Sequence, residues 1–179
     1  TGDVVLLSTQ TASDSASLDF TSLPDYGELI FKFYTIQPAT DEATFQFQTS
    51  LDNSSYDVTV TSTFFTAGHT EGGSSHGPEY RSEKAGFEHA NGTAFQDITE
   101  NTGSAADEAC AGELHLFSNA STTYVKHWYA TMNAYTADLY SRNTFTAGYF
   151  NDTDDITAIQ FKFSSGNINA GKIKMWGVK

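Results

Sequence analysis

The chain has 179 residues, the usual size of one domain; nearly a quarter are Ser or Thr, beside 14 Phe and nine Tyr, and this composition disfavours helices and favours strands. The formal net charge of −13 would repel phosphate groups, which excludes a general role in binding nucleic acid or an anionic membrane. The single cysteine, Cys110, cannot form an internal disulfide, and its acidic neighbours do not favour a reactive thiolate, so we expect a buried or incidental thiol.

The first clear element in chain order is a strand over residues 27–36. In the segment GELIFKFYTI, Leu29, Phe31 and Phe33 fall on one face, and the residues between them fall on the other. Alternation with a period of two is typical of a strand that is buried on one face only. We therefore predict a half-buried strand here.

Three pairs of alternating segments follow, and each pair is predicted to form a β-hairpin. The paired ranges are 44–50 with 56–65, 113–118 with 123–132, and 158–163 with 172–178. In the third pair we expect Phe161 to lie across the turn from Ile173 and Met175. Three similar hairpins predict an all-β fold, an antiparallel β-sandwich formed by one domain over residues 1–179.

Residues 67–112 differ from the rest of the chain and are predicted to form one long polar loop insertion. The segment is rich in Gly, His and Glu, and only residues 94–99 have the pattern of a strand. A loop of this length in a compact domain is usually functional, disordered or in contact with a partner. We take it as a candidate contact surface.

The tetrapeptide FTAG occurs twice, at Phe65–Gly68 and at Phe145–Gly148. Four matching residues do not establish an internal repeat. We interpret the two copies as chance or as a shared local turn.

The charge is unevenly distributed along the chain. Residues 1–119 carry three basic and 18 acidic side chains, whereas residues 120–179 carry six basic and four acidic ones. Lys162, Lys172 and Lys174, near the C-terminus, are a candidate interface for an acidic neighbour. The alternative is a solvated strand face that complements the acidic part of the same chain.

Asp152, Asp154 and Asp155 belong to the densest run of oxygen ligands, NDTDD. Carboxylate oxygens suit calcium, but the run does not match the twelve-residue loop of helix-loop-helix calcium sites. A turn between strands is the favoured interpretation, with a calcium site as the alternative. No metal or other cofactor is otherwise predicted.

Aromatic side chains on the predicted strands are candidates for ligand contact. Trp128, Tyr129 and Trp176, if exposed, would stack on sugar rings as in carbohydrate-binding sandwiches; the alternative is a place in the core or in a subunit interface. The sequence contains no nucleophile elbow, phosphate-binding loop or dinucleotide fingerprint, so we predict that the chain is not an enzyme. A glycosidase with paired carboxylates is a third hypothesis.

The C-terminal stretch, DDITAIQFKFSSGNINAGKIKMWGVK, resembles the closing β-hairpin of many virion proteins of tailed bacteriophages, especially marine phages. The matching positions are Ile156, Ile159, Phe161, Phe163, Ser164, Ser165, Gly166, Asn167, Ile168, Gly171, Ile173 and Gly177. Similarity of style extends over residues 4–66 and 114–179 and leaves the polar loop unmatched.

This resemblance implies a jelly-roll-like sandwich that serves as a capsid decoration, fibre or tail component of an extracellular virion. The expected partners are further copies of the chain, for example in a trimer, and a major capsid or tail protein. No catalytic residue is implied. A carbohydrate-binding jelly roll that recognises host-surface glycans is the alternative function.

Overall fold

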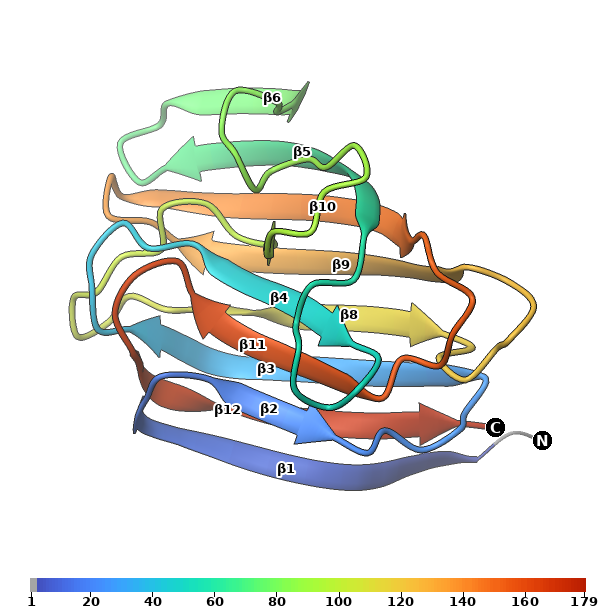
Figure 1. Cartoon of the computed structure of the whole chain (residues 1–179). Coiled ribbons are helices and arrows are strands. Elements are labelled where there is room, and N and C mark those ends of the chain that lie inside the picture. Colours follow the sequence, from blue (N-terminus) through green and yellow to red (C-terminus); the bar gives the residue numbers. More distant parts are fainter. Residues whose placement is uncertain (1–2) are drawn as a thin grey trace.

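The structure, a computed structural model, describes residues 3–179 and consists of two antiparallel sheets packed face to face (Figure 1). The larger sheet has eight strands, in the spatial order β1 (Val4–Ser15), β12 (Ile168–Val178), β3 (Glu28–Pro38), β8 (Cys110–Phe117), β9 (Lys126–Tyr135), β10 (Tyr140–Phe150), β5 (Val60–Thr70) and β6 (Ser75–Tyr80). The smaller sheet has four strands, in the order β2 (Leu18–Thr21), β11 (Ala158–Phe163), β4 (Phe45–Ser50) and β7 (Gln96–Asp97). The predicted all-β sandwich is confirmed, and the jelly-roll order of strands stays a prediction. Over the described residues, no helix is long and apolar enough to cross a membrane.

The period-two alternation of the sequence determines which side chains enter the core. Leu29, Phe31 and Phe33 of β3 are buried as predicted, whereas Tyr34 is exposed. Phe161 of the smaller sheet packs between the sheets against Phe31 and Phe33, with ring centroids 5.3 and 5.2 Å apart. These edge-on and tilted contacts between phenyl rings form the centre of the core.

Of the three predicted hairpins, only the middle one is correct. β8 and β9 pair directly in the larger sheet, as predicted for residues 113–132. The other two predictions are wrong, because β4 and β5 lie in different sheets, and so do β11 and β12. In each case the chain crosses from one layer to the other, so the two strands contribute their apolar residues to the core from opposite layers instead of pairing side by side.

The predicted loop insertion 67–112 is also partly wrong. Its first residues continue β5 as far as Thr70, its last residues begin β8, and between them lie the edge strand β6 and the short strand β7, which pairs with β4 within the predicted 94–99 segment. The segment after β6, residues 81–109, includes β7 and otherwise crosses the inner face of β5 and β10, where the smaller sheet does not extend (Figure 1).

Residues 81–109 act as an inner cover of the larger sheet. Phe87 is fully buried and stacks on Phe64 of β5 at 4.4 Å, and the Thr144 hydroxyl of β10 donates a hydrogen bond to the carbonyl of Ile98. The carboxylate of Glu100 accepts hydrogen bonds from Arg142 of β10 and from Arg81. Much of the segment therefore belongs to the interior, and its polar sequence reflects buried hydrogen bonds as well as solvent exposure.

Candidate binding face

The structure separates the three aromatic residues predicted as ligand contacts. For Trp128 the alternative of a place in the core is the correct one, because its inward position on β9 buries its ring, which meets Phe47 edge-on at 4.9 Å. Trp176 is half-buried on β12. Tyr129, the next residue after Trp128, points outward and is 39% exposed.

Tyr129 belongs to a face of the larger sheet that carries no formal charge. We define the uncharged face as the outward residues of β5, β10 and β9, none of which is buried. They are Thr61, Thr63, Phe65, Ala67 and His69 on β5, Ser141, Asn143, Phe145, Ala147 and Tyr149 on β10, and His127, Tyr129, Thr131, Asn133 and Tyr135 on β9. These positions include no Asp, Glu, Lys or Arg, although the chain has a net charge of −13.

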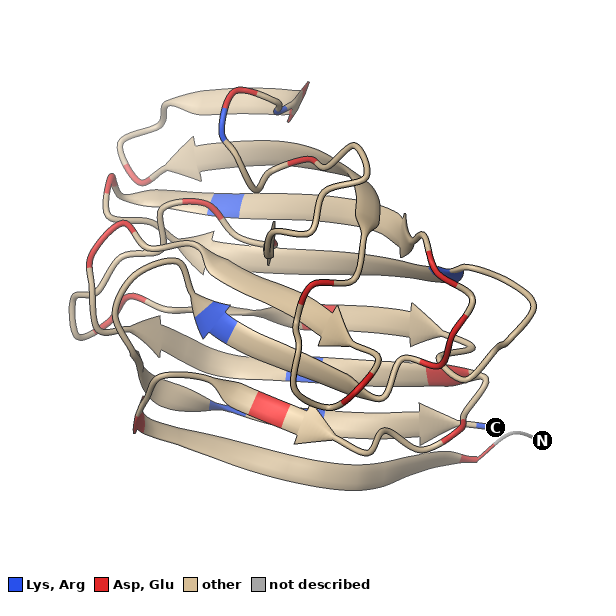
Figure 2. Cartoon of the chain, viewed as in Figure 1, with Lys and Arg blue, Asp and Glu red and all other residues tan. Residues whose placement is uncertain are grey.

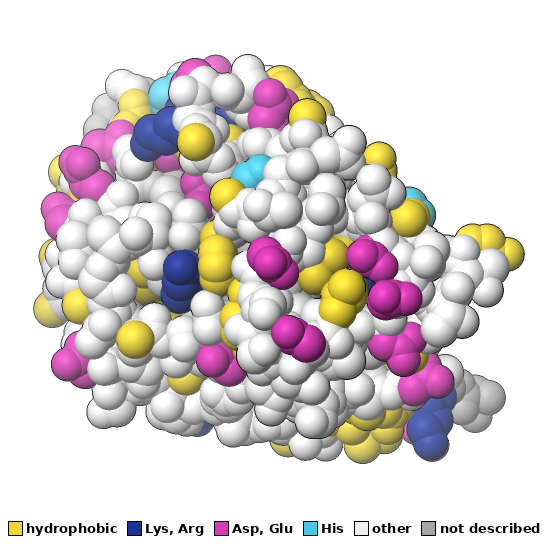
Figure 3. All heavy atoms as spheres, viewed as in Figure 1, with side chains coloured by type: hydrophobic (Ala, Val, Ile, Leu, Met, Phe, Trp, Pro, Cys, Tyr) yellow, Lys and Arg dark blue, Asp and Glu magenta, His cyan; other side chains and the backbone are white. Residues whose placement is uncertain are grey.

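The acidic side chains lie elsewhere. Most are on the segments that connect the strands (Figure 2). Figure 3, which views the molecule from the side of the smaller sheet, shows acidic side chains scattered over that surface. The uncharged face on the opposite side is therefore a local exception to the composition of the chain.

Two phenylalanines form the centre of the uncharged face. Phe65 and Phe145 are direct cross-strand partners in the antiparallel pairing of β5 with β10, and they are 42% and 52% exposed. Phe65 also meets the ring of Tyr80 on β6 edge-on at 5.2 Å. Beside this pair, Ala147 and Tyr129 help to line a shallow hollow of about 340 Å³.

The two FTAG segments meet at this pair. Both lie within strands, so the interpretation as a shared turn is wrong. Because β5 and β10 run antiparallel, the paired phenylalanines mark a local two-fold relation, and the alanines Ala67 and Ala147 lie outward on opposite sides of them. The small side chains leave the phenylalanine rings raised above their surroundings.

Tyr129 is held in place by its neighbours on β8. Its ring stacks on His115 with centroids 4.4 Å apart and planes 11° apart. His115 in turn contacts Glu28 through Nδ1 and Glu113 through Nε2, the latter at 3.2 Å. Burial, with the nearby carboxylates of Glu28 and Glu113, raises the pKa of Tyr129, so its phenol remains protonated and able to donate a hydrogen bond.

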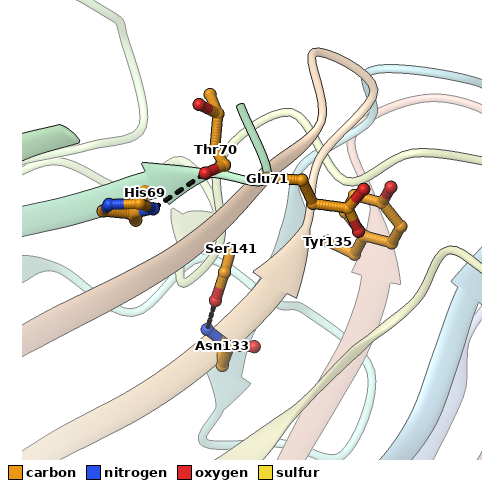
Figure 4. A pocket seen from close by; sticks show the side chains of 6 residues that line it. All are labelled: His69, Thr70, Glu71, Asn133, Tyr135 and Ser141. Atoms are coloured by element: carbon orange, nitrogen blue, oxygen red, sulfur yellow. Dashed lines mark hydrogen bonds between the residues drawn. The ribbon is translucent and has the colours of Figure 1, made fainter. Parts of the chain in front are cut away.

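A second hollow, of about 310 Å³, lies at one end of the uncharged face (Figure 4). The side chains of His69, Tyr135 and Ser141 line it together with Asn133, whose amide donates to the Ser141 hydroxyl at 3.1 Å. Glu71, in the turn after β5, bounds it. A third hollow, at the other end of the same strands, is lined by residues that include Thr61, His127 and Tyr149. The three hollows therefore follow one another along β10.

The lysines predicted as one interface project from opposite faces of the sandwich. Lys172 and Lys174 lie on the outer face of the larger sheet, where the Lys174 ammonium is 5.5 Å from the ring centroid of Tyr34. Lys162 lies on the outer face of the smaller sheet, 3.8 Å above the ring of Phe95. Because β11 and β12 are in different sheets, the three lysines cannot form a single contact surface.

The turn that contains Asp152, Asp154 and Asp155 surrounds the ammonium group of a lysine of the same chain. The fully buried Lys126 reaches into this turn, and its ammonium donates hydrogen bonds to the carbonyls of Asp152 and Asp154. Burial lowers the pKa of Lys126, and the three aspartates oppose that shift. Within residues 3–179, no group of three or more His, Cys, Asp or Glu side chains is arranged to hold a metal ion.

Cys110 is buried as predicted, and its thiol donates a hydrogen bond to the carbonyl of Ile36 at 3.4 Å. Burial raises the pKa of this thiol well above its usual range. An un-ionised buried thiol is a poor nucleophile. Cys110 therefore belongs to the core.

Comparisons with protein-family models, with curated proteins and with solved structures found no match. Sequence reasoning missed Phe65 and Phe145, the most prominent side chains of the face, and the strand β10 that carries the second of them. Two signals in the sequence point to them: the repeated FTAG, and the lack of charge at alternate positions of residues 61–69, 127–135 and 141–149.

Proposed function

We propose that the chain is a non-enzymatic structural protein of a tailed-bacteriophage virion, a capsid decoration, fibre or tail component that self-associates and contacts a neighbouring virion protein. The resemblance of residues 156–177 to virion proteins supports this proposal. These residues form β11 and most of β12, which have neighbours on both sides in their sheets. The resemblance thus rests on residues that form the sandwich. The jelly-roll order of strands that it implies is part of this proposal.

The observation that carries the self-association is the free edge of the larger sheet at β1. This strand has twelve residues and pairs on one side only, with β12. Val4, Val5 and Leu6 are 57%, 42% and 44% exposed. A long edge strand with exposed apolar residues is a site at which another chain adds to the sheet.

The oligomeric state in solution tests this part of the proposal. We expect light scattering to give a mass that is a small multiple of 19.5 kDa, with a trimer as one such state. Val5→Lys is expected to reduce that mass, because it places a charge at the free edge. Tyr124→Lys, at a 73% exposed aromatic outside the sheets, is the matched control and should leave the mass unchanged. A monomeric wild-type chain would contradict self-association.

The place in the virion is tested on intact particles that contain this chain. We expect cryo-electron microscopy to show density that fits the sandwich at symmetry-related positions on the capsid, a fibre or the tail. Particles from which the chain is lost in purification, together with no binding of the purified chain to capsids or tails, would overturn the proposed virion role.

A further inference from the structure

The uncharged face combines three properties that together restrict what can occupy it. It is exposed, it carries raised aromatic rings at its centre, and it lacks formal charge in a chain that is strongly acidic elsewhere. An anionic ligand would find no Lys or Arg on this face and would be repelled by Glu71 and Glu113 at its margins, whereas an uncharged ligand would avoid this repulsion. The electrostatics of the face therefore favour an uncharged occupant.

The side chains around the rings indicate which kind of uncharged occupant fits. Phe65 and Phe145 offer flat apolar surfaces, and Thr63, Thr131 and Asn143 beside them offer hydroxyl and amide groups that both donate and accept hydrogen bonds. A sugar ring presents the complementary groups, an apolar face of C–H groups and a rim of hydroxyls. The core of an interface between copies of a chain would instead be more uniformly apolar.

The dimensions of the face point to more than one sugar ring. The three hollows succeed one another along β10, whose eleven residues span roughly 36 Å at the usual rise of an antiparallel strand. The central hollow, between Phe65, Phe145 and Tyr129, has aromatic walls. The residues that line the outer two include Thr, Ser, Asn, His and Tyr, and the carboxylate of Glu71 bounds one of the two hollows.

We propose that the uncharged face binds an uncharged oligosaccharide that lies along β10, with Phe65, Phe145 and Tyr129 in contact with its rings. Tyr129 is fixed before binding by its stacking on His115, which lowers the entropy lost when the ligand binds. This inference goes beyond the proposed virion role, and it replaces Trp128, which is buried, with the two phenylalanines as contact residues.

The test begins with a glycan array that contains neutral linear oligosaccharides of glucose, galactose and N-acetylglucosamine beside sialylated and sulfated ones. We expect binding to at least one neutral series. For the best neutral oligosaccharide, calorimetry should show that Phe145→Ala weakens binding by about tenfold or more, because exposed aromatic anchors carry much of such affinities. Phe145→Tyr should retain most of the affinity.

The matched control is Tyr34→Ala, which removes another exposed aromatic residue from the same side of the larger sheet, on β3 outside the uncharged face. It should change the affinity by less than twofold. The inference is overturned if no neutral oligosaccharide binds, if charged glycans bind more tightly than neutral ones, or if Phe145→Ala and Tyr34→Ala have equal effects.

Light scattering of the same variants shows whether a saccharide or a second copy of the chain occupies the uncharged face. Phe145→Ala should leave the mass in solution unchanged; a lower mass would show that copies of the chain cover this face and would overturn the inference. Val5→Lys acts at the far edge of the sheet and should change the mass without changing saccharide affinity. Failure of the virion proposal and failure of this inference therefore give different results.

Discussion

At the scale of single residues, Asp97 is an ionisable side chain that is buried although it lies in a polar stretch of the sequence. This residue of β7 is only 3% exposed, and its carboxylate accepts hydrogen bonds from the side chains of Gln46 and Thr44. Burial raises the pKa of Asp97 to about 6, although these hydrogen bonds and the charge of Lys84 oppose the shift. The ionised form is thus less stable in the folded chain than in the unfolded one.

This shift predicts a particular dependence of stability on pH. Between about pH 4 and pH 6 the folded chain binds more protons at Asp97 than the unfolded chain does, so this residue's contribution to stability falls as the pH rises through that window. Asp97→Asn removes the cost of ionisation and should raise the free energy of unfolding at pH 7 by about 1–3 kcal/mol. Urea denaturation at several pH values measures it.

The control for this prediction is Asp57→Asn, at an exposed carboxylate, which should change the free energy of unfolding by less than about 0.5 kcal/mol at every pH. The prediction also requires that Asp97→Asn flattens the profile between pH 4 and pH 6. A variant less stable than the wild type at pH 7 would mean that the hydrogen bonds of the carboxylate outweigh its burial.

At the scale of elements, the segment 81–109 stands in for strands that the smaller sheet lacks. It is attached to the larger sheet by a buried ionic group, in which Arg142 donates to Glu100 at 2.7 Å and Arg81 donates to both carboxylate oxygens of Glu100. The side chains of Glu100 and Arg142 are 4% and 6% exposed. Charges this deeply buried are tolerated only when they are paired.

Removal of the negative charge should therefore loosen this cover. Glu100→Gln leaves the buried Arg142 with only the half-exposed carboxylate of Asp138, 3.7 Å away, as a counter-charge. We expect it to lower the free energy of unfolding by about 3–5 kcal/mol. Glu83→Gln, at a half-exposed partner of Arg81, should lower it by less than about 1 kcal/mol. Chemical denaturation measures both, and equal losses would show that the ionic group does not hold the segment in place.

At the scale of the whole molecule, the chain passes repeatedly between the two sheets. Neighbouring strands in the sequence, such as β3 and β4 or β11 and β12, lie in opposite layers, and most contacts that build the core are distant in the sequence. The buried apolar residues form one cluster that includes both layers. Neither layer can bury its apolar face without the other.

We therefore expect the chain to unfold in a single cooperative transition. Trp128 lies in the core and reports on packing between the sheets by its fluorescence, while far-ultraviolet circular dichroism reports on the strands. The two signals should have coincident midpoints in urea. Separate midpoints would contradict the prediction of one domain over residues 1–179.

Part of the candidate site could be predicted from the sequence. Tyr129 and its outward direction follow from the alternation of residues 126–135, and the same alternation, applied strictly, buries its neighbour Trp128. The pairing of Phe65 with Phe145 could not be predicted, because residues 80 positions apart become neighbours only through the register of β5 with β10. The lack of charge at alternate positions could be seen in the sequence of each strand. That the three strands are adjacent could not.

The sequence by itself determined the all-β class, the buried face of the strand over residues 27–36 and the buried thiol of Cys110, because these depend on composition and on a local period of two. Only the tertiary structure decided which strands pair and which aromatic residues share a face. It also decided that the segment 81–109 covers the inner face of the larger sheet. The physical reason is that a strand's alternation specifies which side is apolar, but the partner across the core and the partner beside it are both compatible with that pattern.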